Sequence, residues 1–90
     1  MAKLTVYSDK GIRSSLAKTR LTQLGVDFDV VDCEADVSGV SFIESKGRDR
    51  DHYPLPQFYV GESVAWEGFK QMKDLNASEI NERVDELNAG

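Results

Sequence analysis

Four segments of the chain have the apolar pattern of β-strands. They are rich in Val, Tyr, Phe and Thr, and Gly, Asp or Pro residues lie between them. The pattern predicts strands at Lys3–Ser8, Val26–Val31, Gln57–Val60 and Ser63–Trp66. In the second strand, alternation puts Phe28 and Val30 on one face and Val31 on the other. Gly61-Glu62, between the last two strands, predicts a hairpin turn.

Apolar residues recur at spacings of three and four in the segments between these strands, which predicts helices. The first helix begins at Ile12, and Gly25 stands where a helix C-terminal glycine belongs. The residues with this spacing are Ile12, Leu16, Ala17, Leu21 and Leu24. A short helix is expected over Ser38–Lys46, with Val40, Phe42 and Ile43 facing inward, and a charged loop follows over Gly47–Pro56.

Helical spacing returns after the hairpin. Phe69–Leu75 predicts one or two helical turns, and Asn76 with Glu79 has the spacing of a capping box. This box opens a last helix, Ser78–Asn88, whose apolar stripe is Ile80, Val84 and Leu87. The order β-α-β-α-β-β-α predicts an α/β fold with a right-handed parallel crossover and a four-stranded mixed sheet.

Length and composition fit one small domain spanning residues 1–90. Hydrophobic residues make up 40% of the 90, enough for a thin core. The chain has no apolar run of the ~20 residues that a membrane helix needs, and its N-terminus has no apolar signal region. We therefore expect a cytoplasmic protein with no membrane partner.

The net charge and the cysteine content limit the classes of function that this protein can have. The net charge is −5, which disfavours nucleic acid as a partner, although residues 1–20 are basic. The single cysteine, Cys33, excludes an intramolecular disulfide, dithiol chemistry and a multi-cysteine metal site within one chain. We expect Cys33 to be a semi-buried structural residue and His52, the single histidine, to be a solvated loop residue, with no metal and no cofactor.

Five short motifs, taken in order, resemble the glutaredoxins, the shortest form of the thioredoxin fold. They are Val6-Tyr7-Ser8, Ala17-Lys18-x-x-Leu21-x-x-x-Gly25, Val26-Asp27-Phe28, Leu55-Pro56-Gln57 and Trp66-Glu67-Gly68-Phe69. The last is similar to motifs of ribonucleotide-reductase-type redoxins and of tailed-phage glutaredoxins. The stretch from Lys46-Gly47-Arg48-Asp49 to Pro56 is most similar to the phage branch. The resemblance covers residues 3–75 and implies a glutaredoxin-like domain, in the host cytoplasm if phage-encoded.

The resemblance places the family's C-x-x-C motif on Gly11-Ile12-Arg13-Ser14. Gly11 stands at the position of the nucleophilic cysteine and Ser14 at the position of the resolving one. A serine hydroxyl is hardly ionised at neutral pH and does not exchange with disulfides. The family's acidic pair for glutathione is also incomplete, because Lys70 follows Phe69. The resemblance therefore implies a redox-inactive protein whose glutathione binding is weak or absent.

The same resemblance implies a face for a protein partner or for glutathione. Its residues are Lys10, Arg13, Tyr53, Leu55, Pro56, Trp66, Gly68 and Phe69. Lys10, Arg13 and Lys18 form either an anion or acidic-partner patch at a helix N-terminus or a set of solvated charges. Tyr53, Trp66 and Phe69 are either interface anchors or ordinary packing residues.

Three functions stay open at this point. The first is a non-catalytic, glutaredoxin-like binding module that docks a protein partner, such as a host enzyme, through the former active-site face. The second is a residual thiol-redox or glutathione-binding protein, an electron carrier of the glutaredoxin type that uses Cys33 or no cysteine. The third is a structural subunit of a larger assembly. We expect no enzyme activity; if there is any, it is that of a disulfide oxidoreductase.

Overall fold

A four-stranded mixed sheet forms the centre of the molecule, in the computed structural model that describes residues 2–35, 37–45 and 56–89. The strands are β1 (Leu4–Ser8), β2 (Phe28–Asp32), β3 (Gln57–Val60) and β4 (Ser63–Trp66), in the spatial order β2-β1-β3-β4. β1 pairs in parallel with β2, and the β1–β3 and β3–β4 pairs are antiparallel. The predicted parallel crossover and hairpin are confirmed.

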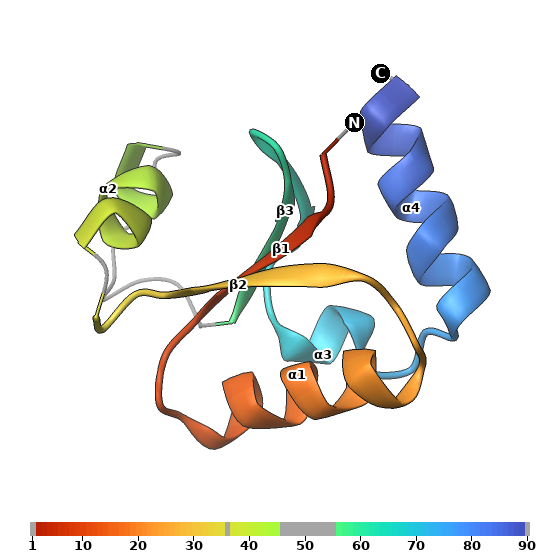
Figure 1. The fold of residues 1–90 in the computed structure, drawn as a ribbon, viewed down its shortest axis with the longest axis horizontal. Coiled ribbons are helices and arrows are strands. Elements are labelled where there is room, and N and C mark those ends of the chain that lie inside the picture. The colour runs from red at the N-terminus through yellow and green to blue at the C-terminus, as the bar shows by residue number, and fades with distance from the viewer. Residues whose placement is uncertain (1, 36, 46–55, 90) are drawn as a thin grey trace.

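Helices cover both faces of this sheet (Figure 1). α2 (Val37–Ser45) lies on one side, and α1 (Ile12–Gln23), α3 (Phe69–Met72) and α4 (Ala77–Ala89) lie on the other. The α/β class and the mixed sheet agree with the sequence prediction. The predicted element order needs one correction, because two helices follow the hairpin where β-α-β-α-β-β-α has one. The reason is the capping box, which starts a new helix directly after the short α3.

Local chemistry sets the ends of these elements. Gly25, after α1, has a φ of +71° and donates its N–H to Thr22 O, as expected of a C-terminal glycine. Gly61 takes a φ of +61° in the β3–β4 turn. Asn76 Oδ1 accepts the Glu79 N–H at 2.9 Å, and Glu79 Oε1 accepts the Asn76 N–H at 3.2 Å. The predicted capping box is confirmed.

The larger core lies between the sheet and the helices α1, α3 and α4. Its fully buried centre is formed by strand residues such as Val6 and Phe58, together with Leu21, Met72 and Ile80 from the three helices. Val84 and Leu87 pack against it, so the predicted stripe of the last helix is confirmed. This core fixes the positions of α1 and α3 relative to each other.

A smaller core lies between the sheet and α2. The rings of Tyr7 and Phe42 stack with centroids 4.9 Å apart, and Tyr59 meets both rings edge-on. Cys33 and Ile43 complete this cluster, together with partly buried side chains that include Val31. Because Phe28 packs in the larger core and Val31 in the smaller one, the predicted alternation of β2 is confirmed.

The first and last described parts of the chain are joined. The Ala2 N–H donates to Asn88 Oδ1, and Asn88 Nδ2 donates to the Ala2 carbonyl, both at 2.9 Å. This pair ties the start of β1 to the end of α4. No helix in the described ranges has the length and apolar content to cross a membrane.

Candidate functional site

The segment that leads into α1 is a tight, internally bonded turn. Gly11 is the N-cap residue of α1, and Ser14 lies in the first turn with no exposed surface. The carboxylate oxygen Oδ1 of Asp9 accepts the Gly11 N–H at 2.8 Å and the Ser14 hydroxyl at 2.9 Å. Ser14 Oγ in turn accepts the Asp9 N–H at 3.1 Å. At the two positions that the resemblance assigns to cysteines, these residues therefore hold the turn together.

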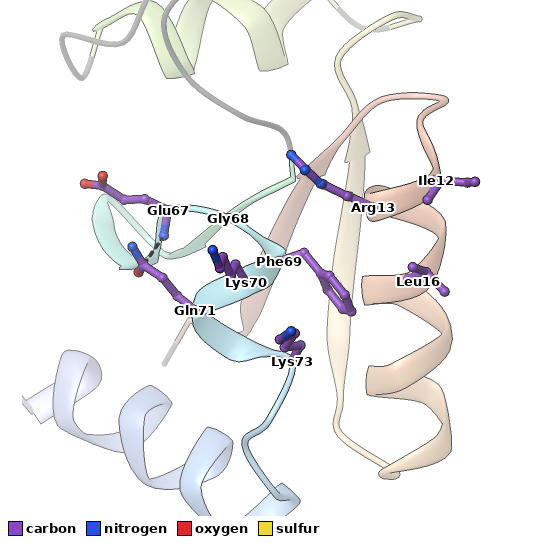
Figure 2. A pocket seen from close by; sticks show the side chains of 9 residues that line it. All are labelled: Ile12, Arg13, Leu16, Glu67, Gly68, Phe69, Lys70, Gln71 and Lys73. Atoms are coloured by element: carbon purple, nitrogen blue, oxygen red, sulfur yellow. Dashed lines mark hydrogen bonds between the residues drawn. The ribbon is translucent and has the colours of Figure 1, made fainter.

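A groove lies beside this turn, between α1 and α3. Its volume is about 640 Å³ and its wall is mostly apolar. Figure 2 shows the lining side chains: Phe69 extends from α3 toward α1, and Arg13 extends from α1 toward the α3 side. The lining residues are Ile12, Arg13, Leu16, Glu67, Gly68, Phe69, Lys70, Gln71 and Lys73. Within this set, Gln71 Oε1 accepts the Glu67 N–H at 3.1 Å, which secures the start of α3.

Large apolar side chains are exposed on the α1 side of the groove. Ile12 is 78% exposed and Leu16 is 49% exposed, although both belong to the pattern that predicted the helix. The inward face of α1 consists of Ser14, Ala17 and Leu21, each fully buried. Ser14 takes the buried position in the first turn, and Ile12 and Leu16 lie outside the core. Figure 2 shows the side chain of Ile12 pointing outward from α1, away from Phe69. Ile12 and Leu16 are available for a contact with another molecule.

All charged side chains of α1 and α3, the two helices that border the groove, are cations. α1 and α3 contain no acidic residue. Their cations are Arg13, Lys18, Arg20 and Lys70, and Lys73 follows directly after α3. None of these five forms an ion pair with the described part of the chain, whereas Lys3, Lys10 and Arg83 all do. The lining of the groove thus carries three cations, Arg13, Lys70 and Lys73, against one carboxylate, Glu67, and is net positive on an acidic protein.

The structure brings together three of the residues that sequence reasoning proposed for the partner face: Arg13, Gly68 and Phe69 all line the groove. Lys10 does not line it, and its ammonium lies 4.0 Å from the Glu34 carboxylate. Tyr53 and Leu55 lie outside the described residues, as do His52 and most of the predicted charged loop.

Two other proposed residues lie in the interior. Pro56 is fully buried, and Trp66 is only 9% exposed, with its ring packed edge-on against Phe58 at 5.9 Å. Trp66 is therefore a core residue, and the packing alternative holds for it.

Cys33 is buried on the opposite side of the sheet from the groove. It is 3% exposed and packs with Tyr7, Ile43 and Tyr59. Burial raises the pKa of Tyr7 above its usual value, and a negative charge on Cys33 or on Tyr59 would raise it further. The expectation of a buried structural thiol is confirmed. No three carboxylate, imidazole or thiol side chains among the described residues come close enough to hold a metal ion.

Sequence reasoning did not place six of the nine lining residues in the site: Ile12, Leu16, Glu67, Lys70, Gln71 and Lys73. Ile12 and Leu16 look like core residues when only their spacing is considered, and Lys73 was not singled out. One signal was present in the sequence, since residues 12–23 and 69–73 contain five cations and no acid. No model of a known protein family matches this chain, and no curated protein matches it either. The function is therefore argued from the groove itself.

Proposed function

We propose that this protein is a non-catalytic, glutaredoxin-like binding module that docks a protein partner through the face around the start of α1. The element order and the mixed sheet support the thioredoxin-like assignment. The positions of Gly11 and Ser14 support it further, because an N-cap residue and a residue buried in the first turn are where the resemblance places the two cysteines. The expected partner is a cytoplasmic protein, such as a host enzyme if the chain is phage-encoded.

The observation that carries this proposal is the location of the groove. It begins at Ile12 and Arg13, the middle residues of the degenerate motif, and runs to Gly68 and Phe69. Exposed apolar side chains in a concave, polar-rimmed surface are typical of interaction sites. On this proposal the groove corresponds to the binding face of the family, and Gly11 stands at the position of its nucleophile.

The thiol-redox alternative gains no support from Cys33. Its thiol is buried among aromatic rings, on the side of the sheet that α2 covers. Reactive cysteines lie in exposed, electropositive surroundings where the thiolate is stabilised. Neither condition holds for Cys33, so binding rather than electron transfer is the function that the geometry favours.

Site-specific photocrosslinking tests this function. A photoreactive phenylalanine analogue placed at Leu16 reports on the groove. The same analogue at Val37, on α2, is the matched control, because Val37 is an equally apolar residue with 78% exposure on the other side of the sheet. In lysate of the native or host cell, we expect one protein to be crosslinked from position 16 and not from position 37. The crosslinking yield should be the same with and without reductant.

Two results would contradict the proposal. If positions 16 and 37 capture the same proteins, the groove has no specific occupant. If the purified protein reduces a glutathione mixed disulfide, and Cys33→Ser abolishes that turnover, then the protein is a thiol-redox enzyme.

A further inference from the structure

We infer that the partner segment bound in the α1–α3 groove is acidic and amphipathic, with carboxylates on either side of an apolar side chain. This inference rests on the proposed function, since it names the chemistry of the occupant of that same groove. It goes beyond that function because a binding module could equally well recognise a neutral or basic partner.

The cations of the groove support an acidic occupant. Lys3 lies 3.4 Å from Asp27 and 3.9 Å from Asp29, and Arg83 lies 3.5 Å from Glu86. A chain with 16 acidic residues therefore neutralises cations elsewhere on its surface. Along the groove, Arg13, Lys70 and Lys73 form no such ion pair with the described residues, and the lining contains one carboxylate, Glu67. The charge of these cations is complementary to carboxylates supplied by another molecule.

The apolar wall supports a polypeptide rather than a nucleic acid. Ile12, Leu16 and Phe69 line the groove between the cations, and only Phe69 is an aromatic ring on which a base could stack. A single strand of nucleic acid is bound by cations together with several aromatic rings, whereas aliphatic side chains match a leucine or valine side chain. The overall charge of −5 also opposes a polyanion as long as a nucleic acid strand.

The acidic helix of a second copy of this chain does not fit the groove. This helix is α4, which carries Glu79, Glu82, Asp85 and Glu86. The apolar stripe of α4, however, is packed into the larger core through Ile80, Val84 and Leu87. The outward face of α4 therefore supplies carboxylates but no apolar side chain for Leu16 and Phe69. We therefore favour a separate partner over α4 of a second copy. The exposed Val30 of β2, which lies between Asp29 and Asp32, is the alternative segment within this chain, and a measurement of self-association tests it.

A binding titration with defined probes tests this inference. The probe is a fluorescein-labelled peptide with two leucines set among glutamates, measured by fluorescence anisotropy with the intact protein. Two matched peptides replace either the glutamates with glutamines or the leucines with serines. We expect the acidic, leucine-containing peptide to bind, and each matched peptide to bind about tenfold more weakly or worse.

Protein variants locate the binding. Lys70→Gln combined with Lys73→Gln removes two groove cations and should weaken binding by roughly tenfold. Lys3→Gln combined with Arg83→Gln is the control, because it changes the net charge equally at cations outside the groove, and it should leave binding within about twofold. Leu16→Ser should weaken binding by about tenfold, and Val37→Ser should not weaken it. Thermal unfolding of each variant confirms that it is folded.

Four results would overturn the inference: failure of the acidic peptide to bind, equal losses in the two double variants, tighter binding of a single-stranded oligonucleotide, or self-association that the groove variants abolish. None of these results removes a specific crosslink from Leu16. If that crosslink is found while the peptide titration fails, the protein is a binding module for a partner of different chemistry, and only this inference falls. If the crosslink is also lost, the proposed function falls as well.

Discussion

On the α2 side of the sheet, the rings of Tyr7, Phe42 and Tyr59 pack around Ile43 and Cys33, and Val37 is the exposed large apolar side chain of α2. On the α1–α3 side, Ile12 and Leu16 are left exposed beside unpaired cations. Both regions use the same kinds of residue, and both lie against the same sheet. The difference shows that apolar content does not separate a core from an interaction surface; what separates them is whether another element of the chain covers the side chains.

Truncating the same residue type in the two regions gives the largest expected difference. Ile43 is fully buried in the α2 cluster, so Ile43→Ala should lower the free energy of unfolding by about 2–5 kcal/mol. Ile12→Ala, in the lining of the groove, should change it by less than about 0.5 kcal/mol. Urea denaturation of the two variants measures both values. A similar loss in both variants would show that Ile12 is part of the core and would remove it from the docking face.

Replacing the two buried serines near the start of α1, Ser8 and Ser14, should change the free energy of unfolding by smaller amounts and in opposite directions. Ser14→Ala removes the hydroxyl that bonds with both the carboxylate and the N–H of Asp9, and should cost about 1–2 kcal/mol. Ser8 is 1% exposed, and its hydroxyl has no hydrogen-bond partner in the described structure. Ser8→Ala should therefore leave stability unchanged or raise it by up to about 1 kcal/mol.

Denaturation of these two single variants under identical conditions provides the measurement, and each serves as the control for the other. A loss on Ser8→Ala as large as that on Ser14→Ala would mean that the Ser8 hydroxyl has a bound partner.

The smallest expected effect is a pH dependence from the α2 side. Burial raises the pKa of Tyr7, so the folded protein holds the phenolic proton more tightly than the unfolded chain. The stability from this group is fully present below about pH 10 and is lost as the pH rises through the folded-state pKa. Tyr7→Phe should therefore show a shallower loss of unfolding free energy above about pH 10 than the wild type. Parallel slopes in the two proteins would mean that Tyr7 is as solvated as in the unfolded chain.

Most of the fold was predictable because it is set by local patterns. Period-two segments became strands, and Gly25 and Asn76 marked helix boundaries by backbone chemistry that depends on neighbouring residues alone. The division between α3 and α4 was also predictable, because the capping box of Asn76 and Glu79 separates the helical turn at Phe69–Leu75 from the last helix, although the element order counted one helix there.

The candidate site was less predictable because tertiary packing decides it. The spacing of Ile12 and Leu16 indicates a helix, but it does not show that Ser14 takes the buried position in their place. Trp66 illustrates the reverse case, since this aromatic residue was assigned to the predicted partner face and is buried in the core. The groove joins residues 12–16 to residues 67–73, and only the packing of α1 against α3 brings these segments together.

The two hydrogen bonds between Ala2 and Asn88 hold the start and the end of the described chain next to each other. In Figure 1 this pair lies at the end of the molecule away from α1 and α3. A polypeptide fused at either end would leave the domain from this same end. The domain is therefore suited to insertion, as a compact unit, into a surface loop of another protein. In such a fusion the groove between α1 and α3 would lie at the end of the domain far from the point of attachment.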